Sequence, residues 1–155
     1  MRKKRVYKKR HEPDLKYARI DLSRFVNYVM KDGKKSVAEK VVYGALEAIK
    51  NSTKDDPIKI FEKAIQNTLP LLEVASKRIG GANYQIPREV RPERQFILAT
   101  RWIIAAARNK KGKPMAQKLA EELIAASKNE GAAIKKKQDT HRMAEANRAF
   151  AHFAR

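Results

Sequence analysis

Apolar residues recur every three to four positions through most of this 155-residue chain, and that spacing restricts the available folds more than any other feature. A half-buried strand would alternate apolar and polar residues, so the pattern predicts a mainly α-helical protein. Hydrophobic residues make up 43% of the sequence, enough to form a buried core. A chain of this length forms one domain of ordinary size. We therefore expect a single helical domain of about six helices.

Local signals mark where several helices begin and end. Gly33 ends the first helix, and Ser36 with Glu39 has the pattern of a capping box at the start of the second. Asp56 followed by Pro57 predicts the N-cap and first residue of the third. We expect the second helix to bury Val37, Val41, Ala45 and Ile49. Core candidates elsewhere include Leu22, Phe25, Val26, Phe61, Ile65, Ile103, Ile104, Leu119 and Leu123.

The end of the chain has helical spacing as well. From about Ala132, a last helix would place Met143, Asn147, Phe150 and Ala154 along one side. We interpret Met143 and Phe150 as packing residues. No internal repeat or low-complexity tract interrupts this organisation.

Residues 71–90 differ from the rest of the chain, because two β-competent runs meet at Gly80-Gly81. Paired glycines tolerate the positive φ angles of a tight turn, so this segment predicts a β-hairpin between the third and fourth helices. Pro87 cannot donate a ladder hydrogen bond and indicates an edge strand. A lone hairpin is marginally stable. It therefore either packs on the helices or projects as an extended arm, and we favour the arm.

The chain is strongly basic and contains no cysteine. Its 36 Lys and Arg against 17 Asp and Glu give a formal net charge of +19, which favours a polyanionic partner. The missing cysteines exclude disulfide scaffolds, zinc ribbons and thiol nucleophiles. No apolar stretch reaches the length of a membrane span, so we expect no membrane association. Seven of the first ten residues are Lys or Arg, and we interpret residues 1–19 as a basic tail preceding a domain at 20–155.

The basic residues gather in clusters at loops and at helix ends. The clusters lie at residues 2–10, 34–35, 77–78, 108–113 and 135–137. Neutralising phosphates with such cations releases counterions and yields salt-sensitive affinity. Tyr7, Tyr17 and Tyr84 lie near these charges and are candidates for stacking on unpaired bases, which favours RNA over duplex DNA. Tyr28 and Tyr43 lie within predicted helices and are interpreted as structural.

Two other functional classes are consistent with parts of this pattern. An architectural DNA-binding protein would use two helices as a helix-turn-helix. A basic RNA-acting enzyme would need acids that converge on a metal, and Asp55-Asp56 and Glu121-Glu122 are the adjacent acidic pairs. The histidines at positions 11, 141 and 152 have no metal-ligand spacing. We expect no catalytic residue, metal or cofactor.

Three motifs resemble the ribosomal protein seven family of the small subunit, in its bacterial or organellar form. They are the run from Glu73 to Val90, Gly33-Lys-Lys-Ser36, and the closing segment from His141 to His152. The resemblance spans nearly the whole chain. It implies a helical domain with an extended hairpin that binds the 3′ major domain of 16S rRNA as a primary binder and nucleates assembly of the subunit head. The implied location is the ribosome, in the cytoplasm or an organelle.

The same resemblance implies partners and site residues. The hairpin and the C-terminal helix would face the subunit interface, exit-site tRNA and small-subunit protein eleven, with protein nine as a further neighbour. The interface arm would consist of Gly80, Gly81, Asn83 and Tyr84. The rRNA-binding candidates are Arg2, Lys3, Lys4, Arg5, Lys8, Lys9, Arg10, Lys34, Lys35, Lys77, Arg78, Arg94, Arg108, Lys110, Lys111, Lys113, Lys135, Lys136, Lys137, His141 and Arg142.

Overall fold

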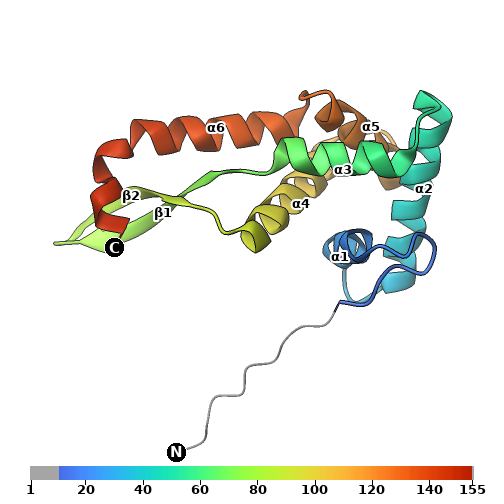
Figure 1. The fold of residues 1–155 in the computed structure, drawn as a ribbon, viewed down its shortest axis with the longest axis horizontal. Coiled ribbons are helices and arrows are strands. Elements are labelled where there is room, and N and C mark those ends of the chain that lie inside the picture. Colours follow the sequence, from blue (N-terminus) through green and yellow to red (C-terminus); the bar gives the residue numbers. More distant parts are fainter. Residues whose placement is uncertain (1–10, 155) are drawn as a thin grey trace, which may run out of the picture.

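The computed structural model describes residues 11–154, which form α-helices and one β-hairpin (Figure 1). This confirms the predicted mainly helical fold with a hairpin between the third and fourth helices. The elements in chain order are α1 (Ile20–Val29), α2 (Lys35–Thr53), α3 (Pro57–Thr68), β1 (Leu72–Ile79), β2 (Ala82–Glu89), α4 (Pro92–Asn109), α5 (Met115–Ser127), α6 (Ala132–Ala146) and the 3-10 helix η1 (Arg148–Ala154).

The hydrophobic core lies where the helices α1 to α5 meet, and the start of α6 adds Ala133 and Ile134 to it. Helix α5 packs against α2, α3 and α4, and its Leu119 and Leu123 are buried. Phe25 of α1 meets Phe61 of α3 edge to face, with ring centroids 5.1 Å apart and an interplanar angle of 81°. Burying one large apolar side chain contributes about 1.5–3 kcal/mol, so these contacts supply much of the stability.

One predicted helix start is confirmed and another is wrong. The Asp56 carboxylate accepts a hydrogen bond from the Ile58 N–H at 3.0 Å, with Pro57 as the first helical residue. Helix α2 begins at Lys35, so Ser36 already lies inside the first turn and forms no capping box. In its place, Lys35 forms an ion pair with Glu39 at 3.8 Å.

Helix α2 buries a face rotated by one residue from the predicted one. Val37 is 54% exposed, whereas Ala38, Val42 and Leu46 are buried. The helix has apolar residues at both sets of positions, so their spacing alone does not identify the edge that meets α5. Ala45 and Ile49 are buried as predicted.

The hairpin has the predicted two-residue turn. Leu72 pairs with Glu89 at its base and Ile79 with Ala82 next to the turn. Gly80 and Gly81 have φ angles of +56° and +93°, which residues with a side chain rarely adopt. The hairpin extends beyond the helical core (Figure 1).

The C-terminal segment covers one side of the hairpin, so the arm is packed along part of its length. The continuous last helix was a wrong prediction: α6 ends at Ala146 and η1 then folds onto β2. The Tyr84 ring lies 5.3 Å from that of Phe150 and 5.8 Å from that of Phe153, centroid to centroid. Phe150 therefore packs as predicted. Met143 is 46% exposed and does not, because α6 buries Ala133, Ile134, Thr140 and Ala144 instead.

The last part of the predicted tail contacts the helical body. Asp14 is buried; its carboxylate accepts the Tyr43 hydroxyl at 2.7 Å and the backbone N–H groups of Lys16 and Tyr17. Burial, together with this hydrogen bond, raises the pKa of Tyr43 to about 12. Tyr43 is thus structural, as predicted. Tyr17, predicted to stack on bases, packs beside Tyr43 with ring centroids 6.3 Å apart.

Residues 1–10, including Tyr7 and the cations from Arg2 to Arg10, lie outside the described residues.

Candidate nucleic-acid interface

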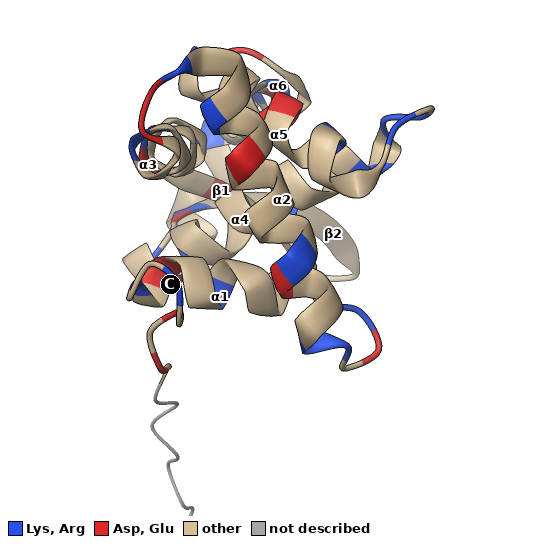
Figure 2. Cartoon of the chain, turned by 90° about the vertical axis from the view of Figure 1, so that its right-hand side faces the viewer, with Lys and Arg blue, Asp and Glu red and all other residues tan. Residues whose placement is uncertain are grey.

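Two basic loops project from the same side of the molecule. Figure 2 shows the α1–α2 and α4–α5 loops extending in one direction, with lysines along both. Between them lies a cleft of about 250 Å³, which we call the basic cleft. Its lining consists of Val29, Lys31, Asp32, Lys34, Val37, Ala38, Val41, Arg108 and Met115. The fold thus brings Lys34 and Arg108, predicted from separate clusters, to one cleft and adds Lys31.

Arg108 connects the two sides of the basic cleft. Its guanidinium donates a hydrogen bond to the Val29 carbonyl at 3.2 Å. Val29 is the last residue of α1, where unpaired carbonyls favour a positive charge. A guanidinium has five N–H donors, so Arg108 keeps further donors for an anion.

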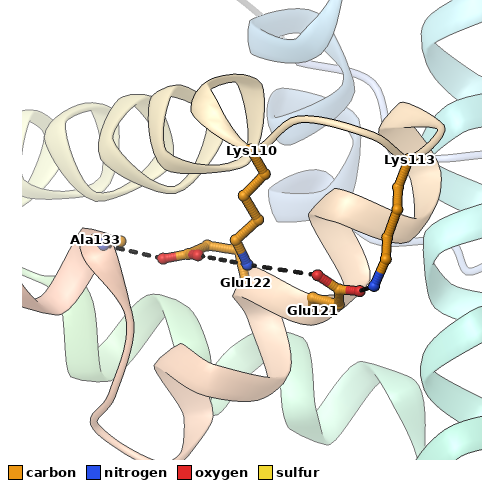
Figure 3. A network of polar contacts seen from close by, with 5 residues as sticks. All are labelled: Lys110, Lys113, Glu121, Glu122 and Ala133. Carbon is orange, nitrogen blue, oxygen red and sulfur yellow. Dashed lines mark hydrogen bonds and ion pairs between the residues drawn. The ribbon is translucent and has the colours of Figure 1, made fainter.

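Glutamates of α5 hold two of the three lysines in the α4–α5 loop. Lys110 Nζ lies 2.9 Å from the Glu122 carboxylate, and Lys113 is hydrogen-bonded to Glu121 (Figure 3). The hydrogen bond from Lys113 lowers the pKa of Glu121 below its ordinary value. Lys111 is exposed and forms no ion pair within residues 11–154.

On α6, two of the candidates face the protein. Lys137 donates to the Asn67 carbonyl at 2.6 Å near the end of α3, and burial lowers the pKa of its ammonium. His141 accepts the Leu71 N–H at 3.1 Å through Nε2. Burial, with Lys137 nearby, lowers the pKa of His141. The candidates Lys135, Lys136 and Arg142 are exposed on the same helix.

At the base of the hairpin, Arg94 is part of an ion-pair cluster. The buried Glu73 accepts from Arg88 Nε at 2.8 Å and from Arg94 Nε at 3.0 Å. Burial alone would raise the pKa of Glu73, but the hydrogen bonds from Arg94 and Arg88 outweigh it and lower the pKa. Arg88 and Arg91 line a cavity of about 370 Å³ beside this cluster and were missed from the sequence. The sequence signal that could have identified them is the regular spacing of Arg88, Arg91 and Arg94, three residues apart.

The distal hairpin combines exposed and packed candidates. Gly80, Gly81 and Asn83 are exposed at the tip, as is Arg78. Tyr84 is half-buried under η1. Lys77 donates to the Phe153 carbonyl at 3.0 Å, so it ties the hairpin to the C-terminal segment.

The acidic pairs have structural roles. Asp56 caps α3, and Glu122 is buried against Lys110. Over residues 11–154, no three His, Asp or Glu side chains are grouped so as to hold a metal ion. None of the described helices is both long and apolar enough to span a membrane.

The fold and the distribution of cations define a class of protein: basic helical proteins whose Lys and Arg side chains gather in loops and at helix ends. A family profile described as Ribosomal protein S7p/S5e matches residues 1–148, and the chain belongs to this family of small-subunit ribosomal proteins. Its members are structural constituents of the ribosome that act in translation, not enzymes. This membership favours the RNA-binding interpretation over the DNA-binding and enzymatic alternatives.

Bacterial relatives match over nearly the whole chain. The small ribosomal subunit protein uS7 of Thermotoga maritima is 54% identical over 153 residues, covering 99% of each chain. That of Teredinibacter turnerae is 53% identical over 154 residues, with the same coverage. That of Xanthobacter autotrophicus is 56% identical over 141 residues, covering 91% of this chain and 90% of the relative.

Proposed function

We propose that this protein is a primary binder of the 3′ major domain of 16S rRNA and nucleates assembly of the small-subunit head. The observation that carries the proposal is the basic cleft between two basic loops that project on the same side (Figure 2). There Lys31 and Lys34 of the α1–α2 loop lie together with Arg108 from the last turn of α4. Cations fixed in one place by a folded body lower the repulsion between RNA helices brought close to each other.

The surroundings of the cleft support a rigid binding surface. Arg108 is held by the Val29 carbonyl, and Lys110 by Glu122. Three exposed lysines on the two loops, Lys31, Lys34 and Lys111, have no ion-pair partner among the described residues. In this proposal they supply contacts to phosphates. Because the fold orders this surface before binding, less conformational entropy is lost when RNA binds.

The hairpin serves a second contact in this proposal. Its tip, with Gly80, Gly81 and Asn83 exposed, extends away from the helical core. We assign this end, with the C-terminal segment, to the subunit interface and exit-site tRNA, and to protein eleven, with protein nine as a further neighbour. The bacterial relatives support a place in cytoplasmic ribosomes.

Crosslinking in a cell lysate, followed by sequencing of the attached RNA, tests this function. We expect crosslinks concentrated in the 3′ major domain of 16S rRNA. Crosslinks spread evenly over unrelated RNA, or found mainly on DNA, would contradict the proposal.

A matched pair of variants tests the basic cleft itself. K31A/K34A removes the two lysines that line it. This variant should reduce the slope of log affinity against log salt by about two for a 3′ major-domain transcript, about one for each lysine that contacts a phosphate. K59A/K63A removes the same charge from exposed positions on α3 and serves as the control. Equal losses in both variants would show that only the net charge matters.

A further inference from the structure

The adjacent acids Glu121 and Glu122 lie in different environments on α5. Glu122 is 1% exposed, whereas the Glu121 side chain is 43% exposed. Both contact lysines of the basic α4–α5 loop (Figure 3). Neighbours on a helix point about 100° apart, so one carboxylate enters the protein and the other reaches its surface.

Glu122 connects three parts of the fold. One carboxylate oxygen lies 2.9 Å from Lys110 Nζ, and the other accepts the Ala133 N–H at 3.0 Å in the first turn of α6. Gly131 permits this approach: its φ is +94°, and a Cβ there would lie 2.9 Å from the Glu122 oxygen. A buried carboxylate held on both sides gives the loop and the start of α6 one defined separation.

Glu121, in contrast to Glu122, lies at the protein surface. Its carboxylate oxygens face Lys113 and, at 3.9 Å, Lys110. An exposed ion pair of this kind is weak and screened by salt. A phosphate can therefore replace Glu121 as the partner of Lys113 at little cost. Glu122 is buried, so its ion pair with Lys110 is less screened by solvent.

We infer that Glu122 is a positioning residue that holds the α4–α5 loop in its RNA-binding conformation, and that Glu121 is a counter-charge which RNA phosphate displaces from Lys113. This inference rests on the proposed function, since it assigns the loop to RNA contact. It predicts that neutralising Glu121 raises the affinity for RNA, whereas neutralising the neighbouring Glu122 lowers it.

Affinity measurements on E121Q and E122Q test the inference. The RNA probes are a transcript of the 16S 3′ major domain and the homopolymer poly(U). E121Q should bind both probes up to about fivefold more tightly at low salt, because the loop lysines lose a competing carboxylate, and this gain should shrink at high salt. E122Q also removes a negative charge, yet it should bind less tightly, because Lys110 and the loop lose their anchor.

Amide hydrogen exchange separates positioning from a general loss of stability. In E122Q, exchange should accelerate at residues 110–113, while the amides of α2 and α3 stay as protected as in the wild type. The glutamine oxygen can still accept the Ala133 N–H, which preserves the start of α6. If E122Q does not fold, K110Q breaks the same ion pair from the loop side and should accelerate exchange at the same residues.

E47Q is the matched control, because Glu47 is an exposed acid whose ion pair, at 3.5 Å, is with Lys16 and not with a lysine of the α4–α5 loop. A gain in E47Q equal to that in E121Q would overturn the inference, since net charge would then explain both. Tighter RNA binding by E122Q would also overturn the inference, as would unchanged amide hydrogen exchange at residues 110–113 in that variant. If the wild type does not bind the 3′ major-domain transcript more tightly than poly(U), the proposed function fails. The roles of the two acids can still be tested in that case, because E121Q should raise and E122Q should lower the affinity for poly(U).

Discussion

At the scale of single residues, core side chains carry stability in proportion to their burial. Phe61 is 2% exposed and Ile104 3%. Replacing either with alanine should lower the free energy of unfolding by about 2–5 kcal/mol, because a cavity replaces apolar contacts. Urea unfolding of the purified protein measures the loss. V37A is the control, since Val37 is 54% exposed and should change stability by less than about half a kcal/mol. Equal effects at all three positions would contradict the assigned core.

His141 makes stability depend on pH. Burial, with Lys137 nearby, lowers its pKa in the folded protein, and its neutral Nε2 accepts the Leu71 N–H. The unfolded histidine, with a pKa of about 6.5, binds a proton more readily, so stability falls as the pH drops below about 6.5. H141Q keeps an acceptor for Leu71 without this titration. Unfolding curves between pH 7.5 and 5.5 should show a smaller decrease for H141Q, and equal decreases would contradict this role.

At the scale of elements, the hairpin is joined to the molecule at two places. Its base is held by Glu73 with Arg88 and Arg94, and its distal half by η1. Removing residues 77–84 and joining Ser76 to Gln85 through Asn-Gly should keep far-UV helicity and cooperative unfolding nearly intact, because the base and the helical core remain. RNA binding should survive in large part. Ribosomes carrying this change should show altered retention of exit-site tRNA.

The same truncation removes the partners of the C-terminal segment. Tyr84 no longer meets Phe150 and Phe153, and the Lys77 contact with the Phe153 carbonyl is lost. We therefore expect faster proteolysis after residue 147 in the truncated protein than in the wild type. A loss of cooperativity, or of several kcal/mol on unfolding, would show that the distal hairpin belongs to the core.

At the scale of the whole molecule, we expect the net charge of +19 to set the strength and salt dependence of RNA binding. Residues 1–10 contain seven of the 36 Lys and Arg. Deleting them should weaken RNA binding and flatten its salt dependence, because fewer counterions are released. Thermal unfolding of the free protein should stay nearly unchanged, since Asp14 and the contacts that follow it are retained. A marked fall in the unfolding temperature would show that these ten residues stabilise the fold.

Features that depend on near neighbours in the chain could be predicted from the sequence alone. The helical spacing, the Asp56 cap and the Gly80-Gly81 turn follow from interactions within a few residues. The same spacing marked Phe61 as part of an apolar helix face, and that residue is buried. The concentration of cations in loops was visible in the same way. These features were sufficient for the fold class, whereas the family resemblance rested on the three sequence motifs at residues 33–36, 73–90 and 141–152.

The tertiary structure alone decided which cations contact other parts of the protein. Lys137 contacts Asn67, 70 residues away in the chain, and Arg108 contacts Val29, 79 residues away. Such partners depend on how helices pack, as does the face that α2 buries and the break before η1. A lysine has the same charge whether it faces a carbonyl or the solvent, so its sequence neighbourhood does not distinguish the two. Packing distinguishes them, because it determines which oxygens come within hydrogen-bonding distance.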